Sequence, residues 1–141
     1  MSSKLLPIPP RQPVVGRHVL VDAWGSSPDL LNSPDAVRAA LVAAVEAGGV
    51  TLIESCVHQF SPYGVTATAT LAESHMAIHT WPEYGYFAAD LFFCGSGDTQ
   101  RAVESLCESF KPRRFTVREL ERGVNIAEPP LEEPEAGDVT A

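Results

Sequence analysis

The residues best suited to chemistry are concentrated in one stretch, residues 72–95, which reads AESHMAIHTWPEYGYFAADLFFCG. In order, its reactive side chains belong to Ser74, His75, His79, Glu83 and Cys94. Hydroxyl, imidazole and thiol groups are the common nucleophiles and proton carriers of enzymes, and a structural hairpin does not need all of them. The stretch is therefore the candidate functional site.

Three interpretations compete for this stretch. The first is structural: a β-hairpin around Pro82 and Gly85 with half-buried histidines.

The second interpretation is a metal site, and its candidate ligands are His75, His79, Cys94, Cys56 and His58. A His-x-x-x-His pair binds zinc from one face of a helix, but the Thr-Trp-Pro that follows His79 opposes a helix here. On a strand, residues four apart are roughly 13 Å apart, too far to share an ion. We therefore expect no metal.

The third interpretation is nucleophilic chemistry by Ser74, His79 and Cys94. A hydrolase triad is disfavoured, because Ser74 lacks the Gly-x-Ser-x-Gly elbow and no aspartate is placed to orient a histidine. The ordered set Glu-Ser-His, Ile-His-Thr-Trp-Pro-Glu and a Cys-Gly after an apolar strand resembles the self-processing site of bacterial and archaeal S-adenosylmethionine decarboxylases. A Gly-Arg-His at residues 16–18 also fits that family, and the resemblance extends over residues 16–123.

The resemblance implies a proenzyme that cuts its own backbone between Glu73 and Ser74. The Ser74 hydroxyl attacks the Glu73 carbonyl, and the resulting ester eliminates to release a new C-terminus and leave dehydroalanine. Tautomerisation and hydrolysis with loss of ammonia then produce a pyruvoyl group at residue 74. In such enzymes this group forms an imine with an amino-acid substrate and accepts the electron pair left by carbon dioxide.

The resemblance also assigns roles by position. His79 assists proton transfer during processing, Cys94 reprotonates the product carbon, and Phe60 stacks on the substrate's adenine. Glu83 lines the substrate site, and Trp81 in the same motif belongs with it.

Two features qualify these roles. On a straight strand Ser74 and His79 lie roughly 16 Å apart and on opposite faces, so the strand bends or another segment or subunit completes the site. In addition, the family's Gly-Val-Ser-Gly is replaced here by GVTA at residues 64–67. Thr66 keeps the hydroxyl expected to help processing, with a stiffer rotamer, and Ala67 adds a methyl group. Either processing tolerates Thr66, or the pocket has changed.

The expected reaction is decarboxylation of S-adenosylmethionine for polyamine (spermidine) biosynthesis. Arginine or ornithine decarboxylation by the same chemistry is an alternative, and a non-catalytic relative that binds or activates a true decarboxylase is another. An assay of carbon dioxide release from the three substrates distinguishes them.

Composition sets the remaining limits. The chain has 141 residues, 45% of them hydrophobic, and a formal net charge of −8, to which residues 128–138 contribute five acids. No basic face for nucleic acid is evident, and no apolar run approaches a membrane span. Three irregularly spaced cysteines do not form a disulfide framework, which favours a reducing, cytoplasmic location.

Hydrophobic periodicity predicts the elements. Residues 17–24 alternate as a strand, and Ser33 caps a helix over 34–47 that ends at a Gly-Gly pair. A strand over 50–59, a turn at 61–64 and a strand through Leu71 follow. Beyond the central hairpin, Asp98 caps a second helix to Phe110, and a final strand occupies 115–121.

These elements predict an α+β two-layer sandwich, an antiparallel sheet with two helices on one face. Residues 16–123 form one domain, flanked by a Pro-rich arm (1–15) and an acidic tail (124–141). The other sheet face needs a cover, and a homodimer of processed protomers, as the resembled family forms, is the simplest one.

Overall fold

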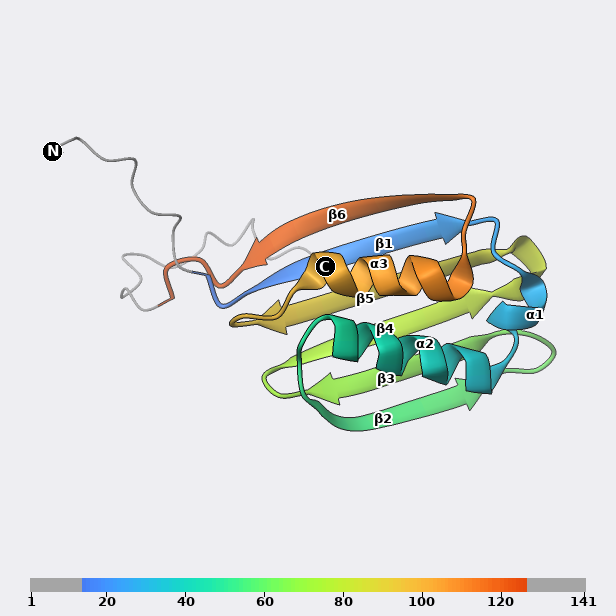
Figure 1. Cartoon of the computed structure of the whole chain (residues 1–141), viewed down its shortest axis with the longest axis horizontal. Coiled ribbons are helices and arrows are strands. Elements are labelled where there is room, and N and C mark those ends of the chain that lie inside the picture. The colour runs from blue at the N-terminus through green and yellow to red at the C-terminus, as the bar shows by residue number, and fades with distance from the viewer. Residues whose placement is uncertain (1–13, 127–141) are drawn as a thin grey trace, which may run out of the picture.

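The computed structural model describes residues 14–126, and its centre is one six-stranded sheet whose neighbouring strands are all antiparallel (Figure 1). The strand order is β2-β3-β4-β5-β1-β6. The strands are β1 (Gly16–Trp24), β2 (Leu52–Gln59), β3 (Val65–Leu71), β4 (Ser74–Trp81), β5 (Tyr86–Cys94) and β6 (Arg114–Arg122). The helices are α1 (Pro28–Leu31), α2 (Pro34–Ala47), the 3-10 turn η1 (Pro82–Tyr84) and α3 (Thr99–Phe110).

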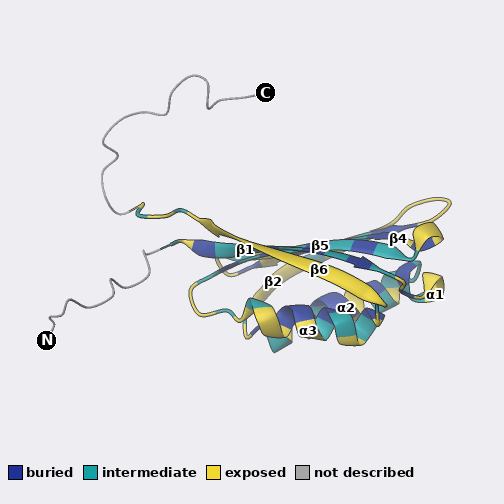
Figure 2. Cartoon of the chain, turned by 90° about the horizontal axis from the view of Figure 1, so that it is seen from above, coloured by how far each residue is buried: buried dark blue, intermediate teal, exposed yellow. Residues whose placement is uncertain are grey.

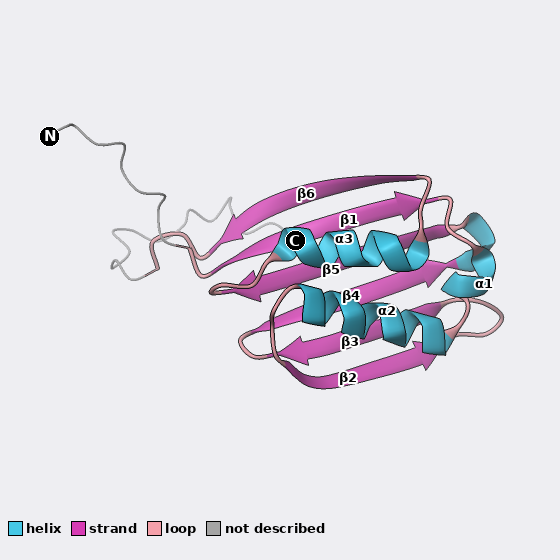
Figure 3. Cartoon of the chain, viewed as in Figure 1, coloured by secondary structure: helices cyan, strands magenta, loops and turns pink. Residues whose placement is uncertain are grey.

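Helices α2 and α3 lie together against one face of the sheet, which makes two layers (Figures 2 and 3). Both begin with side-chain caps: the Ala36 N–H donates to Ser33 Oγ at 3.1 Å, and the Arg101 N–H donates to Asp98 Oδ1 at 3.1 Å. These bonds satisfy amide groups that have no partner within the helix. The predicted α+β sandwich and both predicted helices are confirmed.

The core lies between the helices and the sheet and is built by strict alternation. The four inner strands β1, β3, β4 and β5 contribute alternate residues to it, including Val19, Val21, Ala67, Ala69, Met76, Ile78, Phe87 and Leu91, all buried. The helices contribute the predicted apolar stripes, Val37, Ala40, Leu41, Ala44 and Val45 from α2 and Ala102, Val103, Leu106 and Phe110 from α3. This side of the sheet is the helix-covered face.

The intervening residues point the other way and form the open face. It carries His18 and Asp22 on β1, Thr66 on β3, His75 and His79 on β4, and Asp90 and Cys94 on β5. No described element lies over it (Figure 2). Most of the candidate chemistry of this chain therefore lies on the face that the helices leave uncovered.

The structure differs from the sequence-based elements in detail. Helix α1 and the 3-10 turn η1 were not predicted, because elements of four and three residues are too short to show a helical period. Hydrogen bonding begins one residue before the predicted domain start, since the Val15 N–H donates to the Arg122 carbonyl at 2.9 Å. Most of the predicted arm and tail, residues 1–13 and 127–141, lies outside the described residues.

No described helix has the length and apolar character that crossing a membrane requires.

Thr80 is a buried polar residue that fixes the end of the sheet near α1. Its hydroxyl donates to the Leu31 carbonyl at 2.7 Å and accepts the Val65 N–H at 2.8 Å. One side chain therefore connects β4 with α1 and with the start of β3. Without it, two buried backbone groups lose a partner.

We expect Thr80→Val, which keeps the shape but removes the hydroxyl, to lower the free energy of unfolding by about 1–3 kcal/mol. Urea unfolding followed by circular dichroism measures the change. Thr116→Val on the exposed strand β6 is the matched control and should change the stability by less than about 0.5 kcal/mol. Equal stability of the two variants would show that the Thr80 bonds do not contribute to stability.

Candidate functional site

The predicted processing residues Thr66 and His79 lie side by side on the open face. They are direct partners in the β3–β4 register, and Thr66 Oγ1 lies 3.1 Å from His79 Nδ1. Thr66 stands where the resembled family has serine, and its hydroxyl still contacts the histidine. Ala67, the second departure, faces the helices and is fully buried, so its extra methyl group does not reach the open face.

The predicted substrate-binding residues lie at the same end of the sheet. Trp81 ends β4, Glu83 lies in η1, and Phe60 follows β2. Phe60 and Trp81 are 48% and 39% exposed, and the Phe60 ring stacks edge-on against His58 with 4.6 Å between centroids. Glu83 lines a cavity of about 330 Å³ together with Asn32 and Tyr63. This end offers exposed aromatic surface and a carboxylate.

Ser74 and Cys94 lie at the opposite end of the sheet. The β4–β5 register ends with His75 opposite Phe92, so Ser74 and Cys94 lie just beyond this pair on neighbouring strands. Cys94 is a half-exposed free thiol on the open face. Alternation places the Ser74 side chain toward the helix-covered face, at its edge, where its hydroxyl donates to the Ala72 carbonyl at 3.3 Å.

The bond between Glu73 and Ser74 lies in a tight turn. Leu71 and Ser74 are paired, so only Ala72 and Glu73 connect β3 with β4. Glu73 has φ +62°, the left-handed region that residues other than glycine, asparagine and aspartate seldom adopt. Such a conformation costs of order 1 kcal/mol or more and is retained where the surrounding structure enforces it.

The candidate residues therefore form two groups rather than one site. Strand β4 runs without a register shift from Ser74 to Trp81, so it does not bend between Ser74 and His79. Five residues of strand separate them by roughly 16 Å. Ser74 and Cys94 form one group, and Thr66 and His79 form the other. Within one described chain the structure does not bring the two groups together.

A network that the sequence reasoning missed lies on the open face between these groups. Asp90 Oδ1 lies 2.7 Å from His75 Nε2 and 3.2 Å from His18 Nε2, and Arg122 Nη1 lies 3.0 Å from His18 Nδ1. Asp90 thus restrains His75, the residue that follows Ser74, through this hydrogen bond. The sequence did contain a signal for this network: Asp90 is a carboxylate within the otherwise apolar run of β5, on the face that the helices do not cover.

The same atoms also define a possible metal-binding cluster. The ligand atoms of His18, His75 and Asp90 all lie within 4.8 Å of one another, and this set differs from the one weighed from the sequence. A guanidinium can only donate, so His18 Nδ1 accepts from Arg122 and Nε2 carries the proton. That proton points to Asp90, whereas a metal needs the Nε2 lone pair. The geometry favours a hydrogen-bond network.

A second polar contact stabilises the opposite end of the open face. The Tyr86 hydroxyl donates to Asp22, and the Tyr86 ring packs against Trp24 and Trp81 at centroid distances of 5.7 and 5.3 Å. Burial, the hydrogen bond to Asp22 and the negative charge of Asp22 together raise the pKa of Tyr86 from 10.0 to about 12. This contact fixes the ring beside the exposed Trp81.

Comparisons with known proteins identify chains that this one resembles. Residues 17–123 match the family described as S-adenosylmethionine decarboxylase. The chain is 44% identical over 117 residues to an S-adenosylmethionine decarboxylase proenzyme of Moorella thermoacetica, covering 82% of this chain and 92% of that protein. It is 40% identical over 125 residues to a proenzyme of the same name from Brevibacillus brevis, and this alignment covers 86% of this chain and 94% of that protein.

A solved structure of an adenosylmethionine decarboxylase also resembles this chain. The crystal structure of the adenosylmethionine decarboxylase from Aquifex aeolicus superposes with a TM-score of 0.74 at 32% identity, covering 86% of this chain and 98% of that one. The family match over residues 17–123 includes all six strands, except the first residue of β1, and both long helices.

The raised pKa of Tyr86 predicts a specific alkaline sensitivity. Below pH 10 the phenol is protonated in both the folded and the unfolded chain, and between pH 10 and about 12 only the unfolded chain ionises. The stability that Tyr86 contributes should therefore fall across this window. Urea unfolding at pH 9 and pH 11 should show a larger loss for the native sequence than for Tyr86→Phe, and equal losses would contradict the assignment.

Proposed function

Because the chain belongs to the S-adenosylmethionine decarboxylase family, we propose that it is a self-processing, pyruvoyl-dependent carboxy-lyase that acts on S-adenosylmethionine. Its product would be decarboxylated S-adenosylmethionine, a precursor for polyamine synthesis. The observation that carries the proposal is the position of the Glu73–Ser74 bond, in a two-residue turn beside the strand that presents Cys94. The word proenzyme in the relatives' names supports processing.

The turn favours the first step of processing. Attack of the Ser74 hydroxyl on the Glu73 carbonyl exchanges the amide for an ester and frees the amino group of residue 74. The left-handed conformation of Glu73 raises the energy of the uncut chain. Cleavage leaves β3 and β4 paired, because the scissile bond lies outside their ladder. Residue 74 then begins a new chain, and it is held by its peptide bond to His75 and by its place opposite Leu71 at the end of the β3–β4 ladder.

The residues present fit a pyruvoyl group at position 74. Bound through the residue 74–75 amide, such a group would supply the electron sink for loss of carbon dioxide. His75 is anchored to Asp90, which restricts where residue 74 can lie. Space beside Cys94 is kept free by Gly16, where an added Cβ would lie 3.2 Å from Cys94 Sγ and only 2.6 Å from the Phe93 carbonyl oxygen.

Cys94 is suited to protonate the product carbon. Its thiol is half-exposed on the strand next to β4, at the end where residue 74 lies. Once cleaved, residue 74 can turn around the edge of the sheet toward the open face, because no preceding peptide bond restrains it. In this proposal Cys94 carries the proton to the substrate, and Gly16 keeps the approach open.

The two separated groups support a homodimer as the functional unit. The open face is uncovered, and it carries Thr66 and His79 at one end and Cys94 at the other, where Ser74 lies at the end of β4. Ser74 and His79 are roughly 16 Å apart along the strand. Two open faces packed together about a two-fold axis that lies between them and runs across the strands would place the Thr66–His79 group of one protomer over the Ser74–Cys94 group of its partner. Phe60, Trp81 and Glu83 would approach the same site from the Thr66–His79 end. Each active site would then be shared by two chains.

The alternative functions are not favoured. The relatives named above are S-adenosylmethionine decarboxylase proenzymes, which gives no support to arginine or ornithine as substrate. Ala67, one of the two departures that raised this alternative, points into the core. A non-catalytic role does not explain the retention of Ser74, His79 and Cys94. The free thiols of Cys56, Cys94 and Cys107 suit a reducing cytoplasm, which we propose as the location.

Self-processing predicts two chains in the purified protein. Denaturing intact-mass spectrometry should resolve residues 1–73 and 74–141, the second lacking a free amino group, whereas Ser74→Ala should remain one chain. Carbon dioxide release should then be seen from S-adenosylmethionine but not from arginine or ornithine. A native chain that stays intact on incubation would mean that Thr66 does not replace the family's serine, and the proposed function would fail with its cofactor.

A shared site predicts complementation between two inactive variants. Ser74→Ala removes the nucleophile and His79→Ala removes the proton carrier, so each should remain uncut when expressed alone. When the two are co-expressed, a mixed dimer contains one complete site, and about half of the His79→Ala chains should be cleaved by statistical mixing. Intact masses identify which chain is cut. Absence of cleavage in mixed dimers, with both variants dimeric, would place the whole site within one chain.

A further inference from the structure

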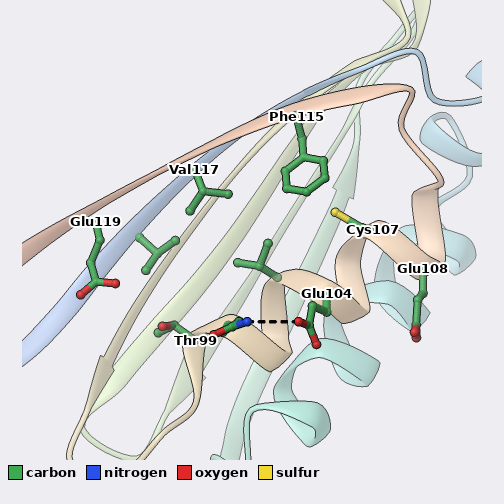
Figure 4. Close-up of a pocket in the computed structure, with 10 residues that line it drawn as sticks. Thr99, Glu104, Cys107, Glu108, Phe115, Val117 and Glu119 are labelled. Atoms are coloured by element: carbon green, nitrogen blue, oxygen red, sulfur yellow. Dashed lines mark hydrogen bonds between the residues drawn. The ribbon is translucent and has the colours of Figure 1, made fainter.

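A groove lies between α3 and β6, on the helix side of the sheet and away from the open face (Figure 4). Its volume is about 600 Å³. The lining is apolar at Val19, Val103, Phe115 and Val117 and acidic at Glu104, Glu108 and Glu119. In Figure 4, Phe115 and Val117 point from β6 toward α3, and Cys107 points from α3 toward Phe115.

The groove exists because two helices do not cover six strands. Helices α2 and α3 pack against each other, and β6 at the sheet edge is exposed along its whole length. Phe115 and Val117 consequently remain 47% and 44% exposed although they occupy core-facing positions of their strand. Apolar surface in a concave site is a typical binding surface for an extended, proline-rich segment.

The N-terminal arm of the chain enters the described structure at one end of this groove. Val14, the first described residue, lines a small cavity together with Thr99, and Thr99 also lines the groove. The thirteen preceding residues can extend over about 40 Å at the spacing of a polyproline segment. Helix α3 has 12 residues and is therefore about 18 Å long. The arm is long enough to follow the whole groove.

The arm also matches the groove in chemistry. Residues 1–13 read MSSKLLPIPPRQP: Leu5, Leu6 and Ile8 are apolar, Lys4 and Arg11 are cationic, and no residue is acidic. The groove presents an apolar floor between carboxylates: Glu119 is paired with Arg17 at 3.2 Å, and Glu104 and Glu108 form no ion pair with a described residue. Four prolines reduce the conformational entropy lost on ordering. The C-terminal residues 127–141 carry five acids and no base, so the same carboxylates repel them.

We propose that residues 1–13 bind in the groove between α3 and β6 of their own chain. In this proposal Leu5, Leu6 and Ile8 cover Phe115 and Val117, and Lys4 and Arg11 approach Glu104 and Glu108. The contact shields Cys107, which lines the groove. The groove lies on the helix side of the sheet and the candidate site on the open face, so this intramolecular contact is separate from the proposed decarboxylase site.

Cys107 provides a reporter within the native sequence. Burial and the charge of Glu104 raise its thiol pKa, so alkylation is compared at one fixed pH. Pulse labelling with iodoacetamide, read peptide by peptide by mass spectrometry, distinguishes Cys107 from the exposed Cys56, the internal reference. Deletion of residues 2–13 should accelerate Cys107 labelling about tenfold, as expected for about 90% occupancy of the groove. Cys56 labelling should not change.

Substitutions in the full-length arm separate docking from a general effect of truncation. Leu5→Ser with Leu6→Ser, and separately Lys4→Glu with Arg11→Glu, should each accelerate Cys107 labelling, the charge reversal more strongly at low salt. Deletion of residues 127–141 is the control and should leave the rate unchanged. Unchanged labelling in the arm variants overturns the proposal. Slower Cys107 labelling at higher protein concentration also overturns the proposal, because a second copy of the chain would then fill the groove.

Discussion

The period of two along strand β4 is the constraint on which the rest of this structure depends. Because β4 is straight, Met76, Ile78 and Thr80 all face the helices, and His75 and His79 must face away. The strand therefore contributes to the core and to the chemistry at the same time. A shift of register by one residue would exchange the two sets, burying the imidazoles and exposing the apolar side chains.

The same constraint explains why the candidate site is divided. Neighbouring strands place Thr66 next to His79 at one end of β4, and Cys94 near Ser74 at the other. A straight strand holds its own ends apart, and in the proposed homodimer the two groups would meet across the interface. The uncovered face is the surface on which this can occur. In this interpretation, association with a second chain is a requirement of the chemistry rather than an addition to it.

Much of the fold followed from local patterns. Ser33 with Pro34, and the Gly-Gly pair after residue 47, marked the first long helix, while alternation in residues 17–24 marked β1. Local patterns could not show that β1 pairs with both β5 and β6, because strand order is set by contacts far apart in the sequence. The Asp90 network was missed for the same reason: its members come from β1, β4, β5 and β6.

Strand order also determines what a cut at residues 73–74 would do to the molecule. Residues 1–73 supply β1, β2 and β3, residues 74–141 supply β4, β5 and β6, and β1 lies between β5 and β6. The two pieces are interleaved, so they remain one folded body without any peptide bond between them. Folding before the cut is unimolecular, whereas reassembly after the cut requires two separate chains to meet. Once unfolded, the mature protein would recover at a rate that depends on its concentration, so its working lifetime would be set by how slowly the sheet opens.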